Sequence, residues 1–357
     1  MPTQGNTALR VGIIGVGAAG RAHLRGFAAQ PDAEIVAIAD TSPALLNQRA
    51  AEYGVPDCYT DYHELLARED IDAISTATPN FLHEPVVVAA VQAGKHALTE
   101  KPLAHTLEAA ERMVAAAQEH NRVLQMVYNQ RCQGDVTAMK QFIDEGGMGR
   151  IYHGKARWMR RQGIPGRGGW FSQRELSGGG PMIDLGIHVL DMALYLMGEP
   201  KPLSVSAAAY AEHGKLGRGY RQTAGQAAKH NVEDYLTGFI RLEGGATLTL
   251  DVSWETYSRF GDDFGVALYG TEGGGEIDIQ RYDRSDSLRL YTDVAGLPAT
   301  INPQLAVGEG HTQVIREFID RVRSGDWAEH HGQHALKRTR IVDACYRSAT
   351  EGREIVL

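Results

Sequence analysis

Short apolar runs alternate with longer amphipathic stretches over the first 130 residues of the chain. The apolar runs predict buried strands at 9–14, 34–39, 58–60, 71–78, 96–99 and 122–128. Between them, apolar residues recur at helical spacing at 18–30, 44–53, 62–67, 83–93 and 107–120. Such regular alternation is typical of a parallel, doubly wound sheet with right-handed crossovers. Ligands of such sheets bind at the carboxyl ends of the strands.

From residue 151 onward the pattern changes to strands that alternate between apolar and polar positions. The strand-like segments are 151–159, 203–210, 234–242, 246–256, 264–269, 276–279 and 287–293. Alternation of this kind, as in Thr247–Val252, is typical of antiparallel neighbours with one solvated face. Amphipathic helices at 311–324 and 334–350 close this region. We therefore expect an α/β domain at 1–130 and an α+β domain at 131–357, built on a large, mostly antiparallel open sheet.

Composition narrows the class of protein. The 357 residues exceed the usual size of one core, and the apolar and charged fractions of 43% and 22% are those of a globular protein. The net charge of −8 argues against a nucleic-acid or membrane partner, and no long apolar run predicts a transmembrane helix. Because the three cysteines are far apart and no export signal is visible, we expect a reducing, cytoplasmic location.

A glycine-rich turn joins the first strand to the first helix. Its fingerprint consists of Gly15, Gly17 and Gly20, with Ala18 and Ala19 between them, and it follows a strand and opens a helix, as dinucleotide binding requires. Asp40 ends the next strand, 20 residues beyond Gly20, where an acid bonds ribose hydroxyls and repels a 2′-phosphate. The alternative is that Asp40 only caps the following helix. We expect a Rossmann domain that prefers NAD to NADP.

Further polar residues fall at the carboxyl ends of the predicted strands. They are Thr78, Asn80, Glu100, Lys101, Asn129 and Arg131. Lys101 draws most attention, because a lysine beside the positively charged nicotinamide ring can exchange a proton near neutral pH. A solvated lysine at a strand end is the alternative.

Residues 178–192 combine a glycine run with a row of ionisable side chains. Asp184, His188 and Asp191 stand at i, i+4 and i+7, so we expect all three on one side of a helix. The alternative is a helix N-terminal aspartate beside a histidine that serves the core. A metal site is disfavoured, because no second histidine cluster supplies further ligands. We expect Gly178–Gly180 to act as a hinge for this helix.

The segment 158–171 interrupts the strand pattern with two tryptophans, three arginines and several glycines. Aromatic faces and arginine donors suit a polyhydroxylated ring, which is apolar on its C–H faces and polar at its rim. A mobile loop with surface arginines is the alternative. The candidate substrate contacts are Trp158, Arg160, Arg161, Trp170 and, more weakly, His230.

Taken together, these motifs resemble the Gfo/Idh/MocA family. The resemblance is carried by Gly15-x-Gly17-x-x-Gly20, Glu100-Lys101-Pro102, Asp184-x-x-x-His188, the turn Thr78-Pro79-Asn80-x-x-His83, and Tyr346-x-Ser348-Ala349 in the last helix. It implies NAD-dependent oxidation of a secondary alcohol of a sugar, anhydrosugar or cyclitol. It also implies a cis Lys101–Pro102 bond and a homodimer or homotetramer formed through the open sheet.

The resemblance assigns roles to individual residues. Lys101, Asp184 and His188 would act on the substrate hydroxyl, with His188 also a substrate contact. Apart from the resemblance, their places at the strand ends lead us to expect Arg131 to contact the substrate, and Thr78, Asn80, Glu100, Lys101 and Asn129, with His83 of the same turn, to line the cofactor site. We expect no metal. Two alternatives stay open: a non-catalytic NAD-dependent sensor, and a glycoside-cleaving enzyme that uses transient oxidation.

Overall fold

The computed structural model describes residues 8–165, 169–215 and 230–357. It divides into two compact units, and neither of them is continuous in sequence. The first comprises Met1–Asn129 and Glu309–Lys337, and the second Gln130–Gly308 and Arg338–Leu357. The sequence-based division at 130/131 placed residues 309–337 in the second domain. Their contacts place them in the first, because the apolar face of a late helix packs there.

The first unit is built on a six-stranded sheet in the order β3-β2-β1-β4-β5-β6. All its strand pairs are parallel, and this order is that of a doubly wound nucleotide-binding fold. The strands are β1 (Leu9–Ile14), β2 (Ala33–Ala39), β3 (Asp57–Tyr59), β4 (Ala73–Thr76), β5 (His96–Thr99) and β6 (Leu124–Met126). The helices are α1 (Ala18–Ala28), α2 (Pro43–Tyr53), α3 (Tyr62–Leu66), α4 (His83–Gln92) and α5 (Leu107–Glu119). The predicted α/β fold is confirmed.

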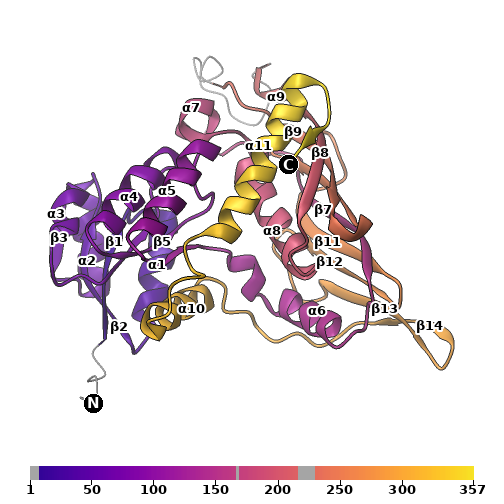
Figure 1. Cartoon of the computed structure of the whole chain (residues 1–357), viewed down its shortest axis with the longest axis horizontal. Helices are drawn as coiled ribbons and strands as arrows, with labels where there is room; N and C mark the ends of the chain where they lie inside the picture. The colour runs from indigo at the N-terminus through magenta and orange to yellow at the C-terminus, as the bar shows by residue number, and fades with distance from the viewer. Residues whose placement is uncertain (1–7, 166–168, 216–229) are drawn as a thin grey trace. The chain divides into compact units, whose positions relative to one another are not determined.

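Helix α10 (His311–Ser324) belongs to this first unit and packs beside α1 (Figure 1). Val314, Ile315 and Phe318 form its buried face. Gly26 of α1 allows the close approach, because a Cβ there would lie 2.3 Å from Cδ1 of Ile315. The Gln125 side chain also donates to the Val314 carbonyl oxygen at 3.1 Å. The pattern of α10 predicts an amphipathic helix but does not say which core it covers.

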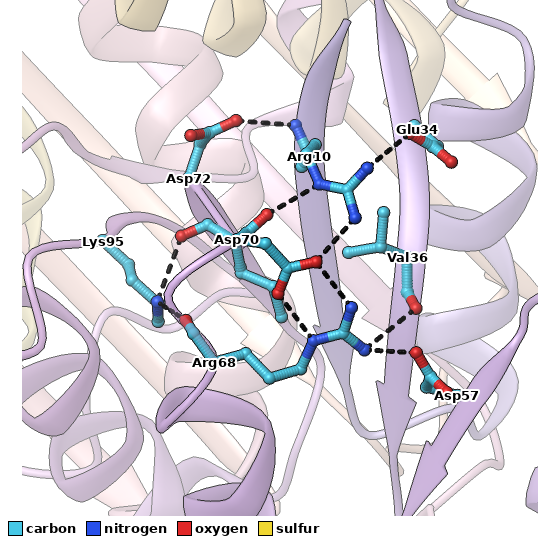
Figure 2. Close-up of polar contacts among 9 residues, drawn as sticks. Arg10, Glu34, Val36, Asp57, Arg68, Asp70, Asp72 and Lys95 are labelled. Carbon is cyan, nitrogen blue, oxygen red and sulfur yellow. Dashed lines mark hydrogen bonds and ion pairs between the residues drawn. The ribbon is translucent and has the colours of Figure 1, made fainter.

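An ion-pair network joins the amino ends of the parallel strands, at the edge opposite the predicted ligand site. Figure 2 shows the guanidinium groups of Arg10 and Arg68 sharing the Asp70 carboxylate, at 2.6 and 2.7 Å. Nζ of Lys95 donates to the Arg68 carbonyl oxygen at 2.6 Å, which fixes the same loop. The network holds the turn that leads into β4.

The second unit contains a nine-stranded sheet in the order β14-β13-β12-β11-β7-β10-β9-β8-β15. Of the strand pairs in the described residues, only β7 and β10 run parallel, so the predicted large antiparallel sheet is confirmed. The strands are β7 (Ile151–Arg160), β8 (Pro202–Tyr210), β9 (Tyr235–Leu242), β10 (Thr247–Ser253), β11 (Asp262–Gly270), β12 (Gly274–Gln280), β13 (Leu288–Val294), β14 (Leu297–Ile301) and β15 (Ile355–Val356). The pattern did not predict the two edge strands β14 and β15.

Alternate residues of these strands form an inner, apolar face. Leu236, Leu250, Val252 and Val266 on this face are almost inaccessible to solvent. The remaining helices are α6 (Gly134–Asp144), α7 (Arg174–Ser177), α8 (Ile187–Leu196), α9 (Glu212–Lys215) and α11 (Gln333–Glu351). Helix α8 packs against β7 and β11 on the inner face, so the stretch around Asp184 and His188 rests on the sheet. Among the described helices, none is long and apolar enough to span a bilayer.

Candidate functional site

The glycine turn after β1 forms an open cradle at the N-terminus of α1. Gly15 adopts a φ of 82°, and a Cβ on Gly20 would lie 1.9 Å from the Gly15 carbonyl oxygen. A Cβ on Gly17, in contrast, would meet nothing within 4 Å. The loop is therefore packed tightly on one side and open on the other, where the first helix amides and Gly17 can approach a pyrophosphate. Ala18 and Ala19 are exposed at this opening.

Asp40 is fixed beside this cradle. Its Oδ2 accepts a hydrogen bond from the Val16 amide at 2.9 Å, and its Oδ1 accepts from the Ser42 amide at 3.0 Å. The cap of α2 is Ser42, whose hydroxyl oxygen accepts from the Leu45 amide. Asp40 is therefore not the cap of that helix, and each carboxylate oxygen retains acceptor capacity for ribose hydroxyls.

The carboxyl edge of the same sheet fits a dinucleotide in a second respect. Within the described part of the chain, Oδ1 of Asn129 is buried with no hydrogen-bond partner. A buried amide oxygen left unpaired costs free energy, so a ligand donor at this position would be favourable. Thr78 and Lys101 follow neighbouring strands β4 and β5 and are partly exposed at the same edge.

Lys101 is anchored through the residue before it. Glu100 is almost fully buried, and its Oε2 accepts the Lys101 backbone amide at 3.0 Å. Its Oε1 lies 3.0 Å from Nε2 of His23 and 3.1 Å from Nε2 of His311. Burial by itself raises the pKa of Glu100, but the bonds from the two histidines outweigh it and hold the pKa well below its usual range. Glu100 thus supports the backbone of Lys101. This role differs from the one predicted for Glu100, which was to line the cofactor site. The Lys101–Pro102 bond is cis.

His23, Glu100 and His311 also place three donor atoms within 4.8 Å of one another, which is compatible with a metal site. Their separations are those of ordinary hydrogen bonds, and Nδ1 of His23 is engaged by the Ser75 hydroxyl at 2.6 Å. Hydrogen bonding therefore accounts for this cluster.

His83 is completely buried and does not line an open site. Its Nδ1 lies 2.8 Å from the Pro102 carbonyl oxygen, and its Nε2 lies 2.9 Å from the Thr78 carbonyl oxygen. Burial lowers the pKa of His83. It joins the two loops that carry Thr78 and Lys101, which corrects its predicted role as a cofactor contact. Asn80, in the same turn, is also buried.

Asp184 and His188 lie in the second unit, where the helix begins with an irregular turn. Residues Met182–Gly186 form a π-helix that continues into α8. Such turns are rare and occur frequently at functional sites. Asp184 Oδ2 accepts a hydrogen bond from the buried Trp254 indole at 2.9 Å. The centre of the His188 ring lies 5.7 Å from that of the Trp158 ring. Asp184 and His188 are both partly exposed.

Trp158 and Arg160 project from β7 beside this pair. The Trp158 indole donates to Asp262 Oδ1 at 2.7 Å, and Arg160 Nε donates to Asp262 Oδ2 at 2.9 Å. Arg160 Nη2 also donates to the hydroxyl of Tyr282 at 3.1 Å. Tyr282 adopts a φ of 66° in a tight turn, and its exposed ring stands edge-on to that of Trp158. These residues form an aromatic and cationic ledge, and we use the name "ledge" for Trp158, Arg160, Asp262 and Tyr282.

Asp191 and Arg131 serve the core of the second unit. Arg131 makes two hydrogen bonds to Asp191, at 2.8 and 2.5 Å. The fully buried Arg338 bonds Asp191 at 2.9 Å and Glu199 at 2.7 Å. Asp191 is therefore paired within the second unit, and the guanidinium of Arg131, which the sequence predicts as a substrate contact, takes part in the same ion-pair network. Asp184 lies in the π-helix, whereas His188 and Asp191 lie in regular α8, so the spacing of Asp184 from the other two differs from that of a regular helix.

The other predicted substrate residues have different surroundings. Arg161 is exposed, Trp170 is half-buried and stacks on Phe171 with ring centres 3.8 Å apart, and His230 is buried. The sequence analysis missed His23, His311, Trp254 and Asp262. His23 follows the glycine fingerprint by one helical turn, which is the one signal that could have singled it out.

Two family models match the chain. "Oxidoreductase family, NAD-binding Rossmann fold" matches residues 9–128, and "GFO/IDH/MocA C-terminal domain" matches residues 136–276. The chain is 31% identical to D-glucoside 3-dehydrogenase of Escherichia coli (strain K12), over 98% of this chain and 97% of that protein. It is 28% identical to levoglucosan dehydrogenase of Pseudarthrobacter phenanthrenivorans, over 89% and 90%.

Solved structures give the same grouping. The structure of a levoglucosan dehydrogenase in complex with NADH and L-sorbose superimposes with a TM-score of 0.85 and 26% identity. The superposition covers 98% of this chain and 99% of that one.

Proposed function

Since this chain belongs to the Gfo/Idh/MocA family and is an NAD-dependent oxidoreductase acting on CH–OH donors, we propose that it oxidises a secondary alcohol on a six-membered sugar, anhydrosugar or cyclitol ring. The observation that carries the proposal lies within the first unit. Lys101 stands at the carboxyl edge of the same sheet whose first turn is the open glycine cradle. The names of the relatives, a glucoside dehydrogenase and a levoglucosan dehydrogenase, favour a pyranose-like ring.

The cofactor would be held by residues of the first unit. Gly15, Gly17 and Gly20 would receive the pyrophosphate, Asp40 the adenosine ribose, and Asn129 a polar group of the cofactor. When bound, NAD supplies the hydride acceptor. The remaining chemistry is proton transfer from the substrate hydroxyl, which the protein must perform.

Lys101, Asp184 and His188 would carry this proton chemistry. An imidazole titrates near neutrality and suits the removal of the hydroxyl proton, which makes His188 the general base. The Lys101 ammonium would stabilise negative charge on the substrate oxygen as it becomes a carbonyl oxygen. The Asp184 carboxylate, fixed by Trp254, would orient the same hydroxyl.

The ledge would recognise the ring itself. The exposed ring of Tyr282 would offer an apolar face to C–H groups, and Arg160 and Asp262 would offer a donor and an acceptor for hydroxyls. Trp158 is buried and stacks on Phe264, so its part in the ledge is to hold Asp262. Because Asp262 already bonds both Trp158 and Arg160, its orientation is fixed before substrate arrives.

The open sheet supports a homo-oligomer, as the sequence predicts. The outer face of its strands carries exposed or partly exposed aromatic rings, including Tyr210, Tyr235 and Tyr269. A Tyr269→Glu variant should shift the molecular mass in sedimentation toward the monomer. The reducing, cytoplasmic location stays a prediction, supported by three free cysteines.

The proposal is tested by supplying NAD with a panel of glucosides, levoglucosan and myo-inositol, and measuring NADH. Net oxidation accumulates NADH and a ketone, whereas glycoside cleavage through transient oxidation accumulates neither, and a sensor turns over nothing. Single-turnover hydride transfer should fall at least about 100-fold in Lys101→Ala and in His188→Ala. Rates near wild type in both variants would refute the assigned roles.

A further inference from the structure

The glycine run Gly178–Gly180 is a packed turn. Gly178 ends α7 with a φ of 85°. A Cβ on Gly179 would lie 1.9 Å from the Tyr346 hydroxyl oxygen, and one on Gly180 would lie 2.1 Å from the Glu233 carbonyl oxygen. Close contact with Tyr346 and Glu233 thus explains Gly179 and Gly180. The run is a packed turn, whereas the sequence predicts a hinge.

Glu233 binds the backbone at the start of the π-helix. Its Oε2 accepts from the Gly180 amide at 2.9 Å, and its Oε1 accepts from the Met182 amide at 3.1 Å. Both bonds are buried, and Glu233 is only 6% exposed. A carboxylate in this position satisfies amides that a helix start leaves unpaired and opposes the positive end of the helix dipole.

Tyr346 holds this carboxylate from the last helix. Its hydroxyl donates to Glu233 Oε1 at 2.9 Å, and its ring is covered by the Arg174 guanidinium, 4.7 Å from the ring centre. Burial raises the pKa of Glu233 above its usual value. The hydrogen bonds from the Gly180 and Met182 amides and from the Tyr346 hydroxyl act in the opposite direction and reduce this rise. An apolar side chain in this place would leave all three donors unpaired in the interior, so the carboxylate is what holds this turn together.

The residue after Glu233 connects it to the other support of Asp184. The Trp254 amide donates to the Asp234 carbonyl oxygen at 3.0 Å, and the Trp254 indole donates to the Asp184 carboxylate. The segment 233–234 therefore fixes Asp184 twice. Glu233 sets the backbone of its turn, and Asp234 sets the indole that bonds its carboxylate.

We propose that Glu233 and Tyr346 are positioning residues, which set the orientation of Asp184 and His188 by clamping the glycine run and the π-helix. The inference rests on the proposed function for the catalytic importance of that pair. Neither Glu233 nor Tyr346 is required to touch substrate or cofactor.

The test compares Tyr346→Phe, Glu233→Gln and Glu233→Leu with wild type in single-turnover hydride transfer. We expect a fall of about 10-fold in Tyr346→Phe with an unchanged KM for NAD. Glu233→Gln, which retains an acceptor oxygen, should keep more activity and more stability than Glu233→Leu, which leaves the Gly180 and Met182 amides and the Tyr346 hydroxyl without their acceptor. Wild-type rates in Tyr346→Phe and Glu233→Leu would overturn the proposal.

Ser348→Ala is the matched control. Ser348 lies on the same helix and is equally buried, and its hydroxyl accepts from the Ala207 amide and donates to the Arg353 carbonyl oxygen. It should lower the melting temperature without lowering the rate. An equal loss of rate in Ser348→Ala would mean that any weakening of this helix has the same effect, and would also overturn the proposal.

A readout independent of turnover separates this inference from the proposed function. The indole resonance of Trp254 in ¹⁵N-tryptophan-labelled protein, assigned with Trp254→Phe, reports the bond to Asp184. It should shift in Tyr346→Phe and Glu233→Leu but not in Ser348→Ala. If it shifts while no sugar of the panel is oxidised, the positioning is supported and only the proposed function fails. An unshifted resonance in both variants refutes the positioning.

Discussion

Trp254 and Asp184 are joined by a hydrogen bond of 2.9 Å from the indole Nε1 to Oδ2, across 70 residues of sequence. The tryptophan is inaccessible to solvent, so its N–H needs an acceptor inside the protein, which this carboxylate supplies. The bond fixes one carboxylate oxygen of Asp184.

Trp254→Phe should therefore impair catalysis more than stability. Phenylalanine keeps much of the packing but removes the donor, so Asp184 loses its fixed rotamer. We expect the rate of hydride transfer to fall about 10-fold, with a loss of about 1–3 kcal/mol in the free energy of unfolding. Trp327→Phe removes another indole donor, to the Val322 carbonyl oxygen, and should leave the rate unchanged.

Glu100→Gln should disturb the backbone of Lys101 while leaving the lysine side chain itself unchanged. Glutamine has one acceptor oxygen, so it cannot accept both from the histidine ring nitrogens at one position and from the Lys101 backbone amide at the other, and at least one bond of the cluster is lost. We expect a lower melting temperature and at least a several-fold slower hydride transfer, measured by stopped flow. Glu84→Gln, which removes the charge that pairs with Arg112 on the surface, should change neither.

His96 should make stability depend on pH. Burial, with a smaller contribution from Arg122, lowers the pKa of His96 to about 4, and its Nδ1 accepts from the Val123 amide at 3.0 Å. The unfolded chain takes up this proton near pH 6.5, whereas the folded chain resists it until about pH 4. The stabilisation is complete above pH 6.5 and is lost as the pH falls toward 4.

Urea unfolding at pH 7.5 and pH 5 measures this effect, and we expect His96 to account for about 1–2 kcal/mol of the difference. His96→Asn retains an acceptor and does not titrate, so its stability should fall less between the two pH values. An equal loss in the free energy of unfolding between pH 7.5 and pH 5 for His96→Asn and wild type would contradict the assignment of this pH dependence to His96.

Arg131→Met should reduce stability and leave the KM for substrate unchanged. Without Arg131 the carboxylate of Asp191, which is 1% exposed, keeps Arg338 as a partner but loses two hydrogen bonds, at a cost of about 1–3 kcal/mol. A KM that rises while the melting temperature is unaltered would restore the predicted role of Arg131 in substrate binding. Arg112→Met, at an exposed pair, is the control for loss of a surface arginine.

Asp40→Ala should weaken the binding of NAD and reduce the preference for NAD over NADP. The variant loses the carboxylate for the ribose and its bonds to the Val16 and Ser42 amides. We expect at least a 10-fold higher KM for NAD and a smaller NAD/NADP ratio of kcat/KM. Asp72→Asn, at the opposite edge of the same sheet, should leave this ratio unaltered.

The sequence was sufficient to predict those parts of the fold and of the site that depend on a local pattern of residues. Strands β1 to β6, the glycine cradle and the place of Asp40 follow from apolar periodicity and turn residues, which act over a few positions. The partners of Glu100 and Asp184 could not be predicted in this way. His311 and Trp254 come from remote elements, and only tertiary packing brings them within 3.1 Å of these carboxylates. The partners of Asp191 could not be predicted either, because Arg131 and Arg338 come from distant parts of the chain.

The chain enters and leaves the first unit more than once, since residues 309–337 return to it after the second unit has been traversed. On the ribosome, the corner that holds Lys101 must therefore wait for His311, which is translated more than two hundred residues later. A gene fragment that ends at codon 130 would encode the whole parallel sheet yet leave the α1 surface around Gly26 without α10. Recombination at one breakpoint could not transplant a finished nucleotide-binding unit from this protein. Because each unit is made of two separate segments of the chain, the two units must be inherited together.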